Sequence, residues 1–386
     1  MKKKILVLFD QIVVHQGGGI NSVYSQLVPL WQQDYEVEIV SVFDPGVDEF
    51  FGVPIKHLIS YQSDIDLRKA KENLMAGNIA QAMKVPVSIW SYLTKRKTAA
   101  QKLASMIQDK ILIAVSPAAA TFVPENVPFI LEIHSSYDYF FQSSALGKVQ
   151  TRMMQRPALT LFRTKADFQK AEKELHPWYV YNFSSLTPKK ADLEVHKPFS
   201  IFYAGRFDPL KNPMRALRCA LQLKNIGAGF HLDLYGDGSL RHEMEKFVKE
   251  NHLEEEVTFK GYVNDQNFYA GHDVMWCTSD VEGFGMAIIE AKAFGIPSIS
   301  TRWGEGVKEV ISQGEDGFIA DGEDQLVSRT LNLMNNPALL SKMKQNASRS
   351  FSRFNADQAR KEWAGIFDAF EQKDCDRFSA SDSFSV

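Results

Sequence analysis

The sequence has few cysteines and no long apolar run, and each of these absences excludes a class of protein. The 386 residues include only three cysteines, Cys219, Cys277 and Cys375, with no CxxC spacing. This pattern excludes a zinc or disulfide framework and fits a reducing compartment. The longest internal apolar run, residues 111–124, is too short to cross a bilayer and contains Pro117. We therefore expect no transmembrane helix.

The charge balance and the missing motifs narrow the class further. The 44 Lys and Arg residues against 47 Asp and Glu residues give a formal net charge of −3, which argues against general nucleic-acid binding. No G-x-x-x-x-G-K-[ST], G-x-S-x-G or histidine-rich metal spacing is present. The segments 64–66 and 374–376 match a DxD metal-binding pattern, but the first lies in a predicted loop and the second in a predicted tail. We therefore predict no metal site.

What the sequence does contain is an alternation of apolar strands and helices. The basic start leads into the apolar run 5–9, which Asp10 interrupts, so we predict a buried first strand rather than a signal peptide, and a cytoplasmic protein. In the first half we predict further strands at 35–42, 111–115, 128–133 and 159–163, with helices at 21–31, over most of 66–110 and at 166–175. In the second half the predicted strands are 199–203, 231–235, 257–260, 273–279, 298–300 and 318–320. Alternation of this kind indicates parallel sheets with helices on both faces.

The chain is long enough for two such domains, each with its own core. We predict an α/β protein with two doubly wound, Rossmann-like domains, at 1–185 and 186–356, around a linker at 181–197. Residues 357–370 are predicted to form a C-terminal helix that crosses back to the first domain, and 371–386 a disordered Ser-rich tail. Ligands bind outside the carboxyl ends of the strands in such sheets, so an interdomain cleft is the expected site.

The stretch from Val281 to Glu290 is predicted to be a turn leading from a strand into a helix. Glu282 lies in the turn and Glu290 about a turn and a half into the helix. Helical side chains lean toward the N-terminus, so both carboxylates can face one pocket. Gly283 and Gly285 leave N–H groups open to an anion at the helix N-terminus. The pattern suits a ligand with hydroxyls and phosphate, such as a nucleotide sugar; two solvated glutamates on a surface helix are the alternative.

Other candidate residues lie at predicted strand ends. Arg206 and Lys211 follow the strand 199–203 and could neutralise a diphosphate, although solvated surface cations are the alternative. The turn 17–19 is three glycines without the G-x-G-x-x-G spacing, so a tight turn competes with a phosphate site. His134 ends its strand and is either a ligand contact or a structural histidine. The segment 235–239 is predicted to be a strand-to-helix turn capped by Ser239.

Taken together, these motifs resemble the GT-B glycosyltransferases of the large retaining group called family 4. The resemblance covers nearly all of residues 1–370 and is strongest over 199–321. It rests on the order of the glycine turn 17–19, His134, Gly205-Arg206 with Lys211, and Glu282-Gly283-Phe284-Gly285 with Glu290. A later turn, 303–309, resembles the family's glycine-rich turn that ends in Glu.

The resemblance implies a GT-B fold and a role for each motif. Arg206 and Lys211 would hold the donor diphosphate and stabilise charge on the departing nucleotide, while Glu282 would contact the transferred sugar. Glu290 would accept hydrogen bonds from the ribose hydroxyls. The residues implied in catalysis are Arg206, Lys211, Glu282 and His134, and those implied in donor binding are Gly18, Gly19, Gly205, Tyr262, Val263, Gly283, Phe284, Gly285 and Glu290. The last set includes backbone groups that would face the base or the phosphates.

The implied activity is a retaining hexosyl transfer that needs no metal and no cofactor. The donor would be a nucleotide sugar, UDP-linked, and the acceptor a saccharide or lipid-linked saccharide in capsular or wall polysaccharide synthesis. A nucleotide-sugar epimerase or sugar phosphorylase of the same fold, and a non-catalytic partner subunit, are the alternatives. Basic residues of the first half (Lys95, Arg96, Lys97, Lys102, Lys148, Arg152, Arg156, Arg163 and Lys165) suggest peripheral contact with an anionic membrane at its inner face. A solvated basic face is the alternative.

Overall fold

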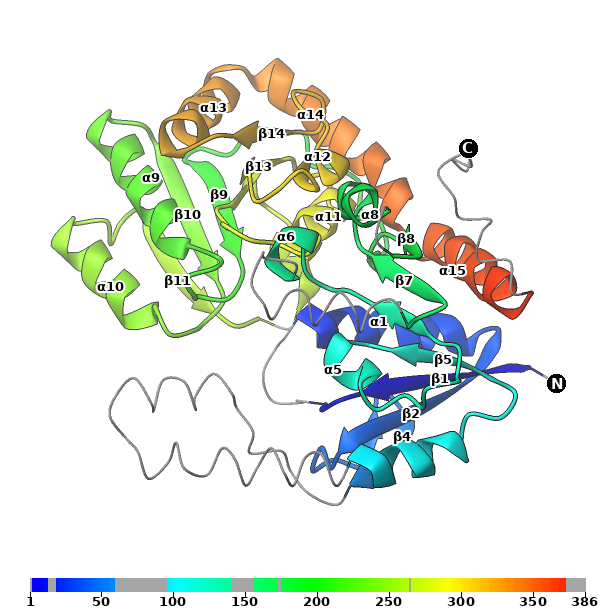
Figure 1. Ribbon diagram of the computed structural model, residues 1–386. Coiled ribbons are helices and arrows are strands. Elements are labelled where there is room, and N and C mark those ends of the chain that lie inside the picture. The colour runs from blue at the N-terminus through cyan, green and yellow to red at the C-terminus, as the bar shows by residue number, and fades with distance from the viewer. Residues whose placement is uncertain are drawn as a thin grey trace, which may run out of the picture. The chain divides into compact units, whose positions relative to one another are not determined.

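The computed structural model describes residues 2–12, 19–59, 96–140, 156–172, 175–263 and 265–372, and the chain forms two compact units (Figure 1). The first unit comprises Met1–Phe162, Phe168–Tyr179 and Glu362–Val386, and the second comprises Arg163–Asp167 and Val180–Lys361. The chain therefore passes from the first unit to the second at the start of the predicted linker. It returns within its last helix, α15 (Ala356–Glu371).

The sheet of the first unit is almost entirely parallel. Its strand order is β3-β4-β2-β1-β5-β6-β7-β8, and only the edge pair β3–β4 is antiparallel. The strands are β1 (Lys3–Phe9), β2 (Tyr35–Phe43), β3 (Glu49–Phe50), β4 (Val53–Ile59), β5 (Lys110–Ala114), β6 (Ile130–Glu132), β7 (Leu159–Phe162) and β8 (Pro177–Tyr179). Residues 5–9 of the central strand β1 are at most 2% exposed, because helices cover both faces of the sheet.

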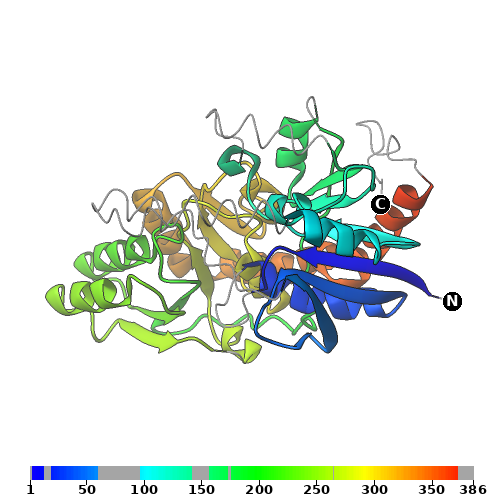
Figure 2. The same cartoon turned by 60° about the horizontal axis from the view of Figure 1, so that its bottom comes forward.

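Helices on opposite faces of this sheet are α1 (Gly19–Gln32) and the helix of residues 96–104 (Figures 1 and 2). Shorter helices are α5 (Pro117–Ala120), α6 (Tyr137–Phe140) and α8 (Lys165–Ala171). Within α15, the Trp363 ring packs edge-on against Trp31 with 4.8 Å between ring centroids. The C-terminal helix thus completes the core of the first unit. Over the described ranges, no helix combines the length and the apolar character needed to span a bilayer.

The second unit is built on a six-stranded parallel sheet in the order β11-β10-β9-β12-β13-β14. The strands are β9 (Phe199–Ala204), β10 (Phe230–Tyr235), β11 (Val257–Gly261), β12 (Val274–Cys277), β13 (Ser298–Thr301) and β14 (Gly317–Ala320). Numbered within the unit this is 3-2-1-4-5-6, the strand order of a Rossmann sheet. The direction of winding therefore reverses between β9 and β12, which pair at Phe202 and Met275.

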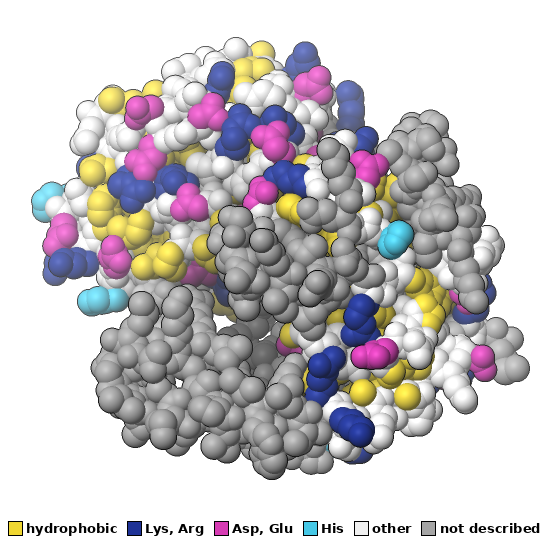
Figure 3. Space-filling view, viewed as in Figure 1, with side chains coloured by type: hydrophobic (Ala, Val, Ile, Leu, Met, Phe, Trp, Pro, Cys, Tyr) yellow, Lys and Arg dark blue, Asp and Glu magenta, His cyan; other side chains and the backbone are white. Residues whose placement is uncertain are grey.

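Helices connect the strands of the second sheet. The helices are α9 (Pro213–Asn225), α10 (Arg241–Glu250), η1 (Gln266–Tyr269), α11 (Met286–Ala293), α12 (Val307–Val310), α13 (Glu323–Asn335), α14 (Pro337–Ser350) and η2 (Phe351–Phe354). Helix α11 is buried along most of its length, including Ile288, Ile289 and Ala291. On the face of this unit seen in Figure 3, cationic and anionic side chains are interspersed.

The predicted strands of both halves are present, and the misses have identifiable causes. Strands β3, β4 and β8 were not predicted, because β4 contains Pro54 and several exposed residues while β8 begins with Pro177 and has only three residues. The prediction of Ser239 as a helix cap was wrong: the N-cap of α10 is Leu240, without a side-chain cap. Most of the helix predicted at 66–110 and the tail from residue 373 lie outside the described residues.

A buried ion pair fixes the start of the second unit against its sheet. Asp273, at the amino end of β12, is fully buried and accepts a 3.0 Å bond from Nζ of Lys344, which is 1% exposed. The same carboxylate accepts from the backbone N–H groups of His196 and Ser200. One carboxylate therefore ties the end of the linker, β9 and α14 together.

We predict that Lys344→Met destabilises the second unit by about 3–5 kcal/mol, because it leaves the Asp273 carboxylate in the core without its cation. Lys342→Met is the matched control, since Lys342 is exposed on the same helix. Urea unfolding followed by circular dichroism measures both free energies. Equal stability of the two variants would contradict the assigned role of the pair.

Candidate functional site

The candidate site lies where the winding of the second sheet reverses. Strand β9 ends at Ala204 and β12 at Cys277. The two strands are parallel neighbours, so the loops that follow them leave the same edge of the sheet. In doubly wound sheets a ligand crevice opens at this switch point, outside the carboxyl ends of the strands. The two loops carry the predicted residues Arg206, Lys211 and Glu282.

Lys211 and Glu282 meet across this switch point. Nζ of Lys211 lies 2.6 Å from Oε2 of Glu282, and the two side chains are 24% and 13% exposed. The other carboxylate oxygen of Glu282 accepts a 2.7 Å hydrogen bond from the hydroxyl of Ser279. Residues that are 71 positions apart in the sequence (282 minus 211) thus form a partly buried cation–carboxylate pair.

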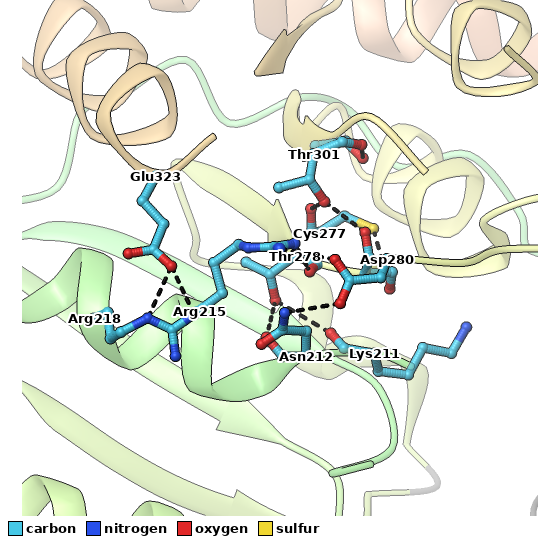
Figure 4. A network of polar contacts seen from close by, with 11 residues as sticks. Lys211, Asn212, Arg215, Arg218, Cys277, Thr278, Asp280, Thr301 and Glu323 are labelled. Atoms are coloured by element: carbon cyan, nitrogen blue, oxygen red, sulfur yellow. Dashed lines mark hydrogen bonds and ion pairs between the residues drawn. The ribbon is translucent and has the colours of Figure 1, made fainter. Parts of the chain in front are cut away.

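Hydrogen bonds hold the two loops to each other (Figure 4). The backbone N–H of Asp280 donates to the carbonyl of Leu210 at 2.9 Å. The side chain of Asp280 accepts from Nδ2 of Asn212 and pairs with Arg215, which also donates to the carbonyl of Thr278. Asn212 has a left-handed backbone conformation (φ 45°), which glycine adopts most readily and asparagine tolerates. The loop geometry around Lys211 is therefore fixed from both sides.

Arg206 is the more exposed cation of the pair predicted from the sequence. Its side chain is 58% exposed, and its guanidinium lies 2.9 Å from Oδ2 of Asp208. Asp208 also accepts a bond from the backbone N–H of Lys211. The buried hydroxyl of Tyr203 donates to the Arg206 carbonyl at 3.1 Å, and burial raises the pKa of this phenol well above its usual value. The hydroxyl therefore stays protonated and keeps its donor role at neutral pH.

A third loop, after β10, packs directly on the backbone of the first. Gly236 has φ 139°, and a Cβ atom there would lie 1.9 Å from the carbonyl oxygen of Gly205. A Cβ atom on Gly238 would lie 2.5 Å from the carbonyl oxygen of Phe207. Only glycine allows this approach. In the sequence, the only sign of this close approach is the pair of glycines in the segment 235–239, where the pattern predicts a strand-to-helix turn.

The turn before α11 separates ligand-facing backbone from core side chains. Phe284 is 2% exposed and its ring stacks on Tyr181 at 5.4 Å between centroids, so only its backbone can meet a ligand. Gly285 is the N-cap of α11 with φ 83°, and it supplies no side-chain cap. The first turn of α11 thus has no capping side chain, although the Ile288 N–H donates to the Gly285 carbonyl, and such a helix end suits an anion. Gly283 lies between Glu282 and this end.

Glu290 has a different environment from Glu282. Its Oε2 accepts a 2.6 Å hydrogen bond from the hydroxyl of Tyr269. Burial raises the pKa of the Glu290 carboxyl, and the bond from Tyr269 partly offsets the rise. The predicted base-binding residues Tyr262 and Val263 follow β11, and Tyr262 is 72% exposed. Within the described residues, no hydrogen bond or ring contact links these two to Glu290.

His134 belongs to the first unit, where it follows β6. Its Nε2 lies 3.2 Å from Oε2 of Glu132, a fully buried carboxylate that also accepts a hydrogen bond from the Tyr24 hydroxyl. Gly19 begins α1, and Gly18 lies outside the described residues. Sequence reasoning missed Asp10, which directly follows β1 and accepts a hydrogen bond from the Ser116 hydroxyl at 2.9 Å. Burial raises the pKa of the Asp10 carboxyl.

Known glycosyltransferases are similar to this chain. Residues 187–350 match the family model of glycosyl transferases group 1. A Haemophilus influenzae protein named as an uncharacterized glycosyltransferase is 25% identical over 75% of this chain and 85% of its own length. An α-1,4-N-acetyl-D-galactosaminyltransferase of Campylobacter jejuni is 30% identical over 45% of this chain and 48% of its own length.

Solved structures resemble the chain over almost its whole length. Staphylococcus aureus TarM, in complex with fondaparinux, α-GlcNAc-glycerol and UDP, has a TM-score of 0.72 at 14% identity and covers 95% of this chain and 99% of its own. Anabaena HepE in complex with UDP and glucose has a TM-score of 0.71 at 16% identity, over 95% and 100%. At such identities the likeness speaks for the fold, and the predicted GT-B fold is confirmed. The match to the model of glycosyl transferases group 1 covers the part of the second unit that carries the Lys211–Glu282 pair.

Proposed function

We propose that the protein transfers a hexosyl residue from a UDP-sugar to a saccharide or lipid-linked acceptor in the synthesis of a cell-surface polysaccharide. The observation that carries the proposal is the Lys211–Glu282 pair at the switch point of the second sheet. A cation for phosphate and a carboxylate for sugar hydroxyls lie side by side there, next to a helix N-terminus without a side-chain cap.

In the proposed site the diphosphate of the donor lies against Lys211, Arg206 and the first N–H groups of α11. These groups stabilise the charge that develops on the leaving nucleoside diphosphate. Lys211 pairs with Glu282 before the donor binds. Binding of the diphosphate therefore changes the contacts of the Lys211 ammonium group. Glu282 keeps its bond from Ser279 and accepts hydrogen bonds from hydroxyls of the sugar. Glu290 accepts from the ribose, and the backbone near Tyr262 meets the base.

The proposed reaction retains the anomeric configuration. The acceptor oxygen attacks the anomeric carbon on the face from which the diphosphate departs. The bond between that carbon and the phosphate oxygen breaks, and the acceptor proton passes to the phosphate oxygen. This route needs cations rather than a carboxylate nucleophile, and Glu282 is held by Lys211 and Ser279 rather than free to attack. We propose that the reaction requires no metal.

The names and bound ligands of similar proteins support a UDP-linked donor and a polymer acceptor. HepE is described in complex with UDP-glucose, and a Staphylococcus aureus relative is named a poly(ribitol-phosphate) α-N-acetylglucosaminyltransferase. The relatives from Campylobacter jejuni, Bacillus subtilis and Staphylococcus aureus that support this choice align with the chain over less than half of their own length. The identity of the sugar and of the acceptor is therefore part of the proposal.

Among the described basic residues proposed for membrane contact, Lys97 and Lys165 are exposed, whereas others are held by the protein itself. Arg96 and Lys102 donate to the backbone carbonyls of Thr121 and Leu58, and Arg163 is only 2% exposed. Other members of the basic set, such as Lys148 and Arg152, lie outside the described residues. Flotation with phosphatidylserine vesicles at physiological salt tests the hypothesis, and absence of binding would refute it.

A donor screen tests the proposed activity. Purified protein is incubated with UDP-, GDP- and dTDP-sugars, with and without EDTA, and release of the nucleoside diphosphate is measured. We expect release from a UDP-hexose or UDP-N-acetylhexosamine, stimulated by acceptor and unaffected by EDTA. An epimerase would convert the sugar without releasing nucleotide, and a non-catalytic subunit would bind nucleotide without turnover.

We predict that Lys211→Met lowers kcat by about 10²–10³-fold, because it removes a charge contact of the leaving group. The exposed Lys246, on α10 of the same unit, supplies the control variant Lys246→Met, which should keep wild-type turnover. Steady-state kinetics with the best donor gives the comparison, and thermal melting reports on folding. Near-normal turnover by a folded Lys211→Met protein would refute the assignment.

Gly236→Ala should weaken nucleotide binding by displacing the backbone at Gly205 and Arg206, since its Cβ atom would meet the Gly205 carbonyl at 1.9 Å. Gly227→Ala is the matched control: Gly227 also has positive φ (73°), but nothing lies within 4 Å of its Cβ position. Calorimetric titration with UDP should give much weaker binding to the first variant only. Equal affinities would mean that this contact does not shape the site.

A further inference from the structure

Tyr269 ends η1 with a buried ring whose position does not depend on its hydroxyl group. The side chain is 3% exposed. Its ring stacks on Phe294 and meets Phe202 edge-on, each with 5.5 Å between centroids. A second stacking contact, with Phe268, has 4.2 Å between centroids. These apolar contacts hold the ring, so the hydroxyl is free to serve a separate purpose.

The hydroxyl group of Tyr269 points at the carboxylate of Glu290. It donates to Oε2 at 2.6 Å, and none of the described residues forms a hydrogen bond with Oε1. Burial raises the pKa of the Tyr269 phenol well above its usual value, so the group remains a donor at neutral pH. One oxygen of Glu290 is therefore fixed, and the other stays available for a ligand.

The same short helix follows the loop that would hold the base. Strand β11 ends at Gly261, Tyr262 and Val263 follow it, and Asp265 caps η1 by accepting from the backbone N–H of Asn267 at 2.9 Å. The chain thus leads from the loop proposed for the base into η1, which ends at Tyr269. Tyr269 in turn contacts Glu290 on α11, the carboxylate proposed for the ribose.

We propose that Tyr269 is a positioning residue for the nucleoside: its hydroxyl orients Glu290 so that the carboxylate accepts hydrogen bonds from the ribose hydroxyls. The inference rests on the proposed function, in which Glu290 contacts ribose. Tyr269→Phe keeps the ring and its stacking and removes only the orienting donor. The carboxyl group then loses its fixed orientation and, because burial favours the neutral form, part of its charge.

The test compares UDP with 2′,3′-dideoxy-UDP by calorimetric titration of the wild type and Tyr269→Phe. Loss of an oriented, charged acceptor should weaken UDP binding about tenfold. The dideoxy nucleotide has no ribose hydroxyls, so its affinity should be the same for both proteins. A ring that served only the packing of η1 would leave both affinities unchanged, because Tyr269→Phe keeps the ring, and that result would overturn the proposal, as would an equal loss of affinity for both nucleotides.

Tyr235→Phe is the matched control from the same aromatic cluster. The Tyr235 ring lies 4.3 Å from that of Phe268 between centroids, and its hydroxyl lies 3.4 Å from Nε2 of His272 rather than near Glu290. This variant should bind both nucleotides as the wild type does. Weakened UDP binding with intact dideoxy-UDP binding in this control as well would overturn the assignment to Tyr269.

A double variant gives a second test of the coupling between Tyr269 and Glu290. Glu290→Gln removes the buried charge, so adding Tyr269→Phe to it should cause no further loss of UDP affinity. Additive losses would contradict the coupling of the two residues. A wild-type protein that binds no nucleoside diphosphate at all would instead refute the proposed function, and this outcome is distinct from the others.

Discussion

The pairing of β9 with β12 is the constraint on which the candidate site depends. Strands adjacent in the sheet are separated in the chain by two complete strand–helix units, β10–α10 and β11–η1. Because the chain winds away from this pair in both directions, the loops after the two strands are not covered by a connection between them. Polar side chains occupy the opening, and the backbone bond from Asp280 to Leu210 shows how closely the loops approach.

Charge around this opening is balanced before any ligand binds. Lys211 pairs with Glu282, Arg206 with Asp208, and Arg215 with Asp280. Each carboxylate holds a long cationic side chain in one place, which lowers the entropy lost when an anion binds. The same pairing means that a diphosphate must compete with carboxylates for the cations. A site of this kind favours ligands that also satisfy the carboxylates, as the hydroxyls of a sugar would.

Much of the architecture could be predicted from the sequence, because buried parallel strands are continuous apolar runs and the candidate residues follow them directly. Arg206, Lys211 and Glu282 were identified from such positions. Ser279, Tyr269 and Gly236 were not, since each matters through a partner that the local sequence does not reveal. Tyr269 and Glu290 are 21 residues apart, and the role of Gly236 follows from the Gly205 carbonyl packed against it. Strand β4 was not predicted because Pro54 and several exposed residues interrupt the continuous apolar run that marks a buried strand.

The two glutamates of the turn and helix looked equivalent in the sequence, yet their surroundings assign them different tasks. Glu282 is held by a cation, an arrangement that can be exchanged when a more negative ligand arrives. Glu290 is held by a neutral phenol in a setting that raises its pKa. A phosphate would gain little by replacing Glu290 as the acceptor for Tyr269, because a neutral phenol binds an anion far more weakly than an ammonium group does. Glu290 therefore suits a neutral hydroxyl ligand whose position is the same before and after transfer, whereas Glu282 suits the part of the donor where charge changes.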